Sequence, residues 1–247
     1  DQSQQLTDAI PYYMFENLYA IIGENSAAIF SNGNIFGSLT EFEPNKGYWF
    51  FINNAVPFEY NVPPEQFSAV DYSTTNDFDF VNPYNQSTQQ SIFFIDEAFY
   101  DGNILDVNYN ISVFCNNNAV GGKAWNGPMT DIIAMGDDGY EFTQGYCETG
   151  QDIQIEISNE DLVSTMYITG NKQWSFNTIN TISISNIETG DVNLNGTINV
   201  TDIIIIIEHI IETNTIINLH QLFLSDINND SFTNITDIIA LINLIIA

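Results

Sequence analysis

The sequence of 247 residues has very few basic side chains: three lysines and no arginine stand against 32 aspartates and glutamates. The formal net charge at pH 7 is −29. Because neutralising phosphates requires clusters of Lys and Arg, this composition excludes nucleic acids and anionic membrane surfaces as partners. A compact fold with this charge is destabilised by self-repulsion, and bound divalent cations would relieve that repulsion.

Long apolar runs and histidines are also scarce. The longest apolar run covers only residues 203–207, which is far too short to span a membrane. The two histidines, His209 and His220, lie on or beside apolar segments, and no nucleophile, zinc or phosphate-loop pattern surrounds them. The sequence therefore predicts a protein that is not an enzyme, with a glycoside hydrolase as a remote alternative.

Only two cysteines are present, Cys115 and Cys147. The acidity, the shortage of basic residues and the abundance of Asn, Tyr and Phe favour a secreted, extracellular protein, in which a pair of cysteines usually forms a disulfide. The alternative is a pair of free, buried thiols.

The front of the chain reads as a small α+β module over residues 1–62. Apolar residues from Pro11 to Ile22 follow a helical spacing that Gly23 would end, and short strand-like pieces follow it. Residues 63–88 are rich in Pro, Ser, Thr and Asn without clear periodicity, which predicts a linker.

The centre of the chain, residues 89–187, is β-like throughout. Short strand candidates, including one at residues 140–146, alternate with clusters of Gly, Asn and Asp, a spacing typical of a β-sandwich. We therefore expect a mainly β fold with some α structure, followed from residue 190 to residue 247 by a separate C-terminal module.

That last segment contains an internal repeat, the strongest signal in the sequence. The stretch DVNLNGTINVTDIIIIIEHII, which begins at Asp191, aligns with DINNDSFTNITDIIALINLII, which begins at Asp226. Each copy places oxygen-bearing side chains at positions 1, 3, 5, 9 and 12 of a loop that leads into an apolar helix. This is the order in which a twelve-residue loop supplies ligands to Ca²⁺, with the carbonyl of position 7 as a further ligand.

The sequence thus predicts two Ca²⁺ ions, one in each loop. The ligands expected in the first loop are Asp191, Asn193, Asn195, Thr197, Asn199 and Asp202. Those expected in the second are Asp226, Asn228, Asp230, Phe232, Asn234 and Asp237.

The two loops differ in charge and at position 6. Gly196 permits a sharp turn in the first loop, whereas Ser231 should add strain in the second. The second loop carries three carboxylates and the first carries two, so we expect the second site to bind more tightly. The alternative to calcium is a pair of ordinary Asn- and Asp-rich turns before helices.

The duplicated loop and helix resemble a type I dockerin over residues 190–247. The resemblance implies a calcium-folded module that docks on a protein partner through its helix faces. Dockerin recognition often uses a Ser-Thr-like pair at loop positions 10 and 11, and here Val200–Thr201 and Ile235–Thr236 share only the threonine. Residues 37–52 and 120–147 in turn resemble modules of secreted proteins from marine bacteria that often precede such a tail.

The helices carry more apolar surface than a module of about 58 residues can bury alone. Isoleucines 203, 206, 207 and 210 can face the core of the module, which leaves Ile204, Ile205 and Ile211 as candidate docking residues. These residues would pack either against the protein's own β-domain or against a neighbouring copy of the chain. The second kind of contact could propagate into a fibre.

Two further features can be interpreted either as structural or as functional. Asp137, Asp138 and Glu141 could bind additional ions at subunit contacts, or they could form a solvated turn, which we favour. Trp49, Trp125 and Trp174 could stack on a polysaccharide, although tryptophans are more often core residues.

Two functions follow from these features. The first is a secreted structural or adhesion protein that docks on a neighbouring subunit through its calcium-folded tail. The alternative is a carbohydrate-binding accessory protein that docks on a cohesin-type scaffold.

Overall fold

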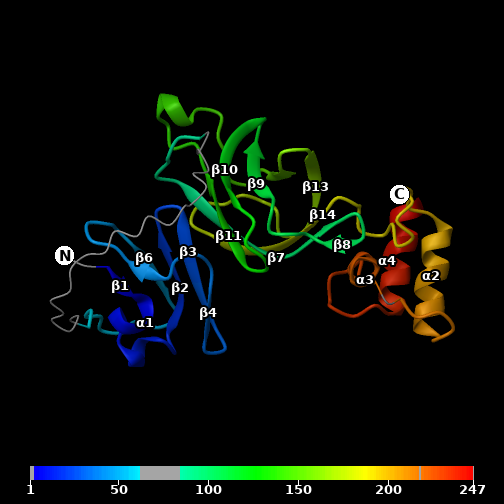
Figure 1. Cartoon of the computed structure of the whole chain (residues 1–247), viewed down its shortest axis with the longest axis horizontal. Coiled ribbons are helices and arrows are strands. Elements are labelled where there is room, and N and C mark those ends of the chain that lie inside the picture. The colour runs from blue at the N-terminus through cyan, green and yellow to red at the C-terminus, as the bar shows by residue number, and fades with distance from the viewer. Residues whose placement is uncertain (1–2, 62–83, 217, 247) are drawn as a thin grey trace.

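The computed structural model describes residues 3–61, 84–216 and 218–246. The chain is mainly β with few helices, as the sequence predicts, and its longest helices lie in the C-terminal module (Figure 1). The elements in chain order are β1 (Gln4–Gln5), α1 (Leu6–Ala9), η1 (Tyr12–Met14), β2 (Leu18–Gly23), β3 (Ser26–Ser31), β4 (Asn34–Phe36), β5 (Glu41–Phe42), β6 (Trp49–Ile52), β7 (Gln90–Tyr100), β8 (Asn103–Ile104), β9 (Asn110–Cys115), β10 (Asn118–Ala124), β11 (Thr130–Met135), η2 (Glu141–Thr143), β12 (Gln154–Ser158), β13 (Val163–Gly170), β14 (Ile179–Ser185), α2 (Val200–Ile210), α3 (Leu219–Ser225) and α4 (Ile235–Ile246).

The helix expected between Pro11 and Ile22 is wrong. The chain instead forms the short turn η1 and then strand β2, which pairs with both β3 and β6 in a four-stranded sheet. Leu18, Ile21 and Ile22 are all buried because a central strand is covered on both faces. Such a strand loses the simple alternation of a half-buried one and can imitate a helical stripe.

The strands of residues 90–185 join in one continuous sheet. The strand order is β10-β9-β12-β13-β14-β7-β11, with β8 paired to the outer part of β7. All neighbours are antiparallel except β14 and β7, which run parallel. The expected sandwich of two separate sheets is therefore not seen, because β13 pairs with strands of both halves and joins them.

This sheet curls until its two end strands, β10 and β11, approach each other. A Cβ atom built on Gly121 of β10 would lie only 2.2 Å from the carbonyl oxygen of Ile133 on β11, so only glycine fits here. The enclosed space is filled by buried side chains such as Phe93, Ile111 and Ile155.

The predicted disulfide between Cys115 and Cys147 is confirmed, with an S–S distance of 2.01 Å. It ties the end of β9 to the segment after η2. The strand expected at residues 140–146 is wrong, since this stretch forms η2 and a turn. Its Tyr140 and Phe142 are exposed, so Tyr146 is the aromatic residue of this stretch that packs in the core of the sheet.

The N-terminal part packs directly on the curled sheet. Ile22, Ala27 and Ile29 belong to the same hydrophobic core as the sheet's interior, while a second cluster lies beneath η1 and α1. Of the expected linker at residues 63–88, residues 63–83 lie outside the described residues. Tyr84 is buried in the core of the sheet.

A buried carboxylate fastens the two parts together. Asp131 on β11 accepts hydrogen bonds from the backbone N–H groups of Ala27 (2.9 Å) and Ser38 (2.8 Å), and from the Ser38 hydroxyl (2.9 Å). Lys123 Nζ lies 2.9 Å from the same carboxylate. Asp131 is thus fully satisfied by donors from both parts of the chain.

We expect Asp131→Ala to destabilise the protein by roughly 3 kcal/mol, because it leaves buried donors and the Lys123 charge without an acceptor. Asp152→Ala is the matched control, because it also removes an ion pair. In this pair, the side chains of Asp152 and Lys172 are both about half exposed. The control should cost less than about 1 kcal/mol. Urea denaturation followed by tryptophan fluorescence measures both, and equal losses would contradict the role assigned to Asp131.

Candidate metal centre

The C-terminal module is built around two helices that follow the two predicted loops. Helices α2 and α4 pack side by side over a small core of Val192, Ile206, Ile238 and Leu241 (Figure 1). Each helix begins at position 10 of its loop, so loop residues and helix start form one unit.

In the first loop, two aspartates organise the backbone. The Asp191 carboxylate accepts hydrogen bonds from the N–H groups of Asn195 (3.1 Å) and Gly196 (2.6 Å). The carboxylate of Asp202 is fully buried and accepts from two further N–H groups, those of Asn193 (3.0 Å) and Asn199 (2.9 Å). Asp202 thereby also completes a capping box at the start of α2.

The second loop repeats this scheme residue by residue. Asp226 accepts from the N–H groups of Asp230 (3.0 Å) and Ser231 (2.7 Å). The fully buried Asp237 accepts from those of Asn228 (3.2 Å) and Asn234 (2.8 Å). The sequence repeat is therefore a structural repeat as well.

Both loops turn at the same places. Positions 4 and 6 adopt positive φ angles in each loop, with Gly196 at +79° and Ser231 at +70° in position 6. A serine in this region is strained by roughly 1 kcal/mol, whereas glycine is not. The strain expected for the second loop is therefore located at Ser231.

The remaining predicted ligands line the same turns. The position 5 side chains accept from the N–H groups of position 7, Asn195 from Thr197 (2.9 Å) and Asp230 from Phe232 (2.9 Å). The carbonyl oxygens of position 7 in turn accept from the position 9 amides, which are Asn199 and Asn234.

The second loop gathers three carboxylates into one place. One oxygen each from Asp226, Asp230 and Asp237 lie within 4.8 Å of one another. No lysine or arginine follows Lys172 in the sequence, so no permanently charged basic side chain of this module can balance them. Clustered carboxylates that lack a cationic side chain fit a hard divalent cation, which prefers oxygen ligands.

Residues 137–141 show a different use of carboxylates. Asp138 accepts from the N–H of Thr88 (2.9 Å) and from the hydroxyl of Thr143 (2.6 Å), and Asp137 accepts from two glycine N–H groups. These bonds, foremost that from Thr143, hold the pKa of Asp138 well below its usual value. The structure thus favours the turn over an additional ion here.

Helices α2 and α4 present matching rows of exposed apolar side chains. The residues stand at loop-and-helix positions 10, 14, 17 and 21 of each repeat, a spacing that keeps them on one helix face. Their exposed fractions are 63% and 61% for Val200 and Ile235, 46% and 55% for Ile204 and Ile239, 39% and 41% for Ile207 and Ile242, and 60% and 75% for Ile211 and Ile246. We call these eight residues the apolar rows.

The apolar rows correct part of the predicted docking set. Ile204 and Ile211 belong to them, but Ile205 packs against the core of the module and is only partly exposed. Ile207 and Ile210, expected in the core, are exposed instead. Comparing equivalent positions of the two repeats would not by itself have found the rows, because both copies are also apolar at buried positions such as Ile206 and Leu241.

Helix α3 joins the module to the β-domain. Its His220 is fully buried, stacks on Phe99 of β7 at 4.9 Å, and forms a hydrogen bond of 2.7 Å from Nε2 to the Ser185 hydroxyl. The N–H of Gly102 donates to Nδ1 (3.1 Å), so the proton of this neutral imidazole lies on Nε2. Neither histidine nitrogen is available as a catalytic base.

Residues 189–246 match the family model of the type I dockerin domain. The C-terminal module is a type I dockerin domain. Dockerin domains bind calcium and dock on protein partners of the cohesin type. No curated protein and no solved structure matches the chain, so the resemblance of residues 37–52 and 120–147 to secreted modules stays a prediction.

Two other predictions concern surfaces outside the dockerin domain. Trp125 and Trp174 are buried, with indole N–H groups bonded to the carbonyls of Leu105 and Ala134, so they cannot stack on a sugar. Trp49 is exposed. Within the part of the chain that the structure describes, no helix combines the length and the apolar character needed to cross a bilayer.

We expect calcium titration to reveal two sites, with the tighter one in the second loop. Asp230→Asn should weaken the second site about tenfold, because it lowers the ligand charge to that of the first loop. Asn195→Asp is the reciprocal change and should tighten the first site. Calorimetry on metal-stripped protein measures both affinities, and circular dichroism should show helix gained on calcium addition. Unchanged affinities in both variants would contradict the ligand assignment.

The contact of His220 with the β-domain should become less stable at acidic pH. Burial, partly offset by the nearby Asp101 carboxylate, lowers the pKa of His220 to about 4, from a usual value of about 6.5. Below pH 6.5 His220 becomes protonated in the unfolded chain but stays neutral in the folded protein. The free energy of unfolding therefore falls as the pH falls towards 4.

Between pH 7.5 and pH 5, this should cost about 2 kcal/mol of unfolding free energy. His220→Gln has no titrating ring and should lose this part of the pH dependence. Urea denaturation of both proteins at the two pH values, with calcium in excess, measures the difference. Identical pH dependence would rule out the buried neutral imidazole.

Proposed function

We propose that this chain is a non-catalytic extracellular protein that is held in an assembly by its dockerin domain. The observation that carries this proposal is the pair of apolar rows on α2 and α4. Eight apolar side chains on two adjacent helices, each more than a third exposed, form a surface of the kind that protein partners cover. The disulfide and the acidic composition support an extracellular location.

Calcium has an indirect role in this function. Two ions, one in each loop, would balance the carboxylates at positions 1 and 12 of both loops and at position 5 of the second loop. The position 12 residues Asp202 and Asp237 lie in the first turns of α2 and α4, so the ions would fix where the helices begin. The spacing of the two apolar rows depends on those starting points, and docking should therefore require calcium.

The partner is a cohesin-type module or, in a finer proposal, a neighbouring copy of the chain. The dockerin domain and the N-terminal part lie at opposite ends of the longest axis (Figure 1). A contact between one end and the other would be heterologous and would extend into a fibre. Sedimentation velocity and electron microscopy of the pure protein, with calcium or with EDTA, separate these cases: calcium-dependent polymers identify self-assembly, whereas a monomer that binds a cohesin module identifies the scaffold.

The apolar rows can be tested directly. Ile204→Asp combined with Ile239→Asp should weaken calcium-dependent docking at least a hundredfold, because it places charges at equivalent positions in the centre of both rows. Val163→Asp is the control, since Val163 is also apolar and 67% exposed but lies on β13 of the curled sheet. Calorimetry with the cohesin module, or sedimentation for self-assembly, measures the effect. A loss of binding in the control alone would move the docking surface to the β-domain.

A further inference from the structure

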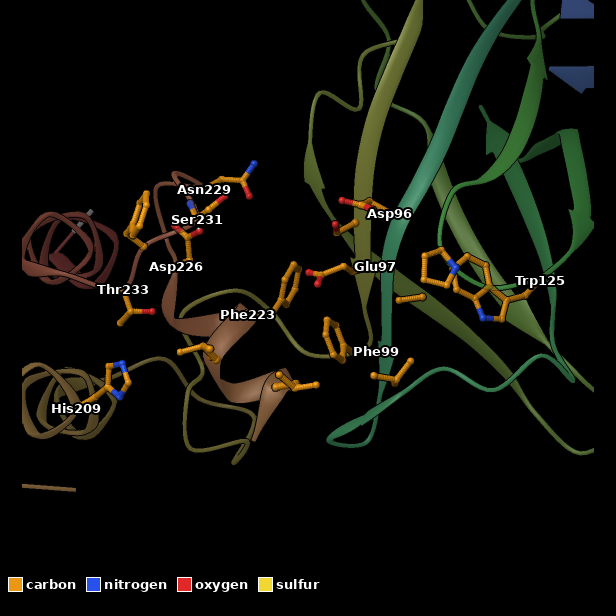
Figure 2. A pocket seen from close by; sticks show the side chains of 17 residues that line it. Asp96, Glu97, Phe99, Trp125, His209, Phe223, Asp226, Asn229, Ser231 and Thr233 are labelled. Carbon is orange, nitrogen blue, oxygen red and sulfur yellow. Dashed lines mark hydrogen bonds between the residues drawn. The ribbon is translucent and has the colours of Figure 1, made fainter. Parts of the chain in front are cut away.

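A groove with a volume of about 550 Å³ lies between the curled sheet and the dockerin domain. One wall comes from β7 and its neighbours, and the other from α3 and the second calcium loop (Figure 2). Ligand pockets of this size are common at domain interfaces. None of the eight residues of the apolar rows lines this groove, so it is a separate surface.

Two acidic side chains enter the groove from the same strand. The pairing of β7 with β14 shifts by one residue between Ile182 and Ile184, which places an extra residue on β7 at Asp96 and Glu97. Such a bulge re-aims side chains that would otherwise alternate across the sheet. Figure 2 shows both carboxylates directed from β7 towards the dockerin domain.

The rest of the groove is mainly apolar. Phe99 forms part of the β7 wall, and Phe223 faces it from α3 with the ring centres 5.1 Å apart. Leu219 and Phe232 are largely exposed at the rim. An exposed apolar rim around one buried and one half-buried aromatic ring is typical of a surface that receives a side chain from a partner.

The groove holds acidic side chains but no lysine, and of its three carboxylates only Asp226 belongs to a proposed calcium site. Asp96, Glu97 and Asp226 line it together with His209, and no lysine does. Burial raises the pKa of Glu97, and the adjacent carboxylate of Asp96 raises it further. A cation that enters the groove would therefore meet two carboxylates, aromatic faces and an apolar wall at once.

We propose that this groove receives an arginine or lysine side chain from the protein that docks on the dockerin domain. The aliphatic stem would lie against Phe99 and Phe223, and the charged head would pair with Asp96 and Glu97. This inference rests on the proposed docking function and extends it, because it makes the β-domain part of the recognition surface. Partners would then be distinguished by whether they carry a basic residue that reaches the groove as well as a surface that covers the apolar rows.

The probe for this test is the peptide acetyl-Leu-Arg-Leu-amide, with acetyl-Leu-citrulline-Leu-amide as its uncharged counterpart. With calcium in excess, the arginine peptide should shift the NMR signals of the amides around Glu97, Phe99 and Phe223 in the ¹⁵N-labelled full chain. The citrulline peptide should bind at least fivefold more weakly.

Asp96→Asn combined with Glu97→Gln should lower the affinity for the arginine peptide to that for the citrulline peptide. Glu160→Gln combined with Asp161→Asn is the matched control, since it removes the same charge from an adjacent acidic pair in the exposed turn between β12 and β13. The control should leave binding unchanged.

Three results would overturn the proposal: equal binding of both peptides, no shift of groove amides at 10 mM peptide, or a third calcium ion that shifts the amides of Asp96 and Glu97 and excludes the peptide. The Ile204→Asp and Ile239→Asp protein separates the two proposals, because it should lose docking but keep the peptide. A wild-type chain that binds the peptide but no cohesin module or second copy would refute the docking function alone.

Discussion

The dockerin domain depends on carboxylates that are buried in a module without any lysine or arginine. Asp202 and Asp237 have no exposed surface and receive only backbone hydrogen bonds from the chain itself. Backbone donors orient a carboxylate but carry no full positive charge, so the cost of burying the charge is only partly offset. A bound divalent cation would supply this missing positive charge and would fix where the two helices begin.

The loops could be predicted from sequence because their donors are local. All predicted ligands of each site lie within twelve residues, and the hydrogen bonds of Asp191 and Asp226 reach only four or five residues along the chain. The curled sheet was harder to predict from the sequence, because strand pairing such as that of β14 with β7 joins residues almost 90 positions apart. The bulge at Asp96 and Glu97 depends on that register and has no local signal.

Two of the errors share a physical cause, which is burial on more than one side. Strand β2 looked helical because both of its faces are covered, and Ile205 looked available because the first helix is apolar almost all round. Periodicity reports which residues are apolar but not which neighbour covers them. The matching exposure of the two repeats resolves the second ambiguity, since equivalent positions in both copies share the same environment.

The connection between β14 and the dockerin domain has a mechanical consequence. The chain leaves the sheet at Ser185, at the end of a central strand held by β7 on one side and β13 on the other. A partner that pulls on the dockerin domain would load these two ladders along the strand direction, so that many hydrogen bonds resist together. His220 of α3 is hydrogen-bonded to Ser185 at the same point. Tension on the dockerin domain would therefore reach the sheet directly, without first extending a flexible linker.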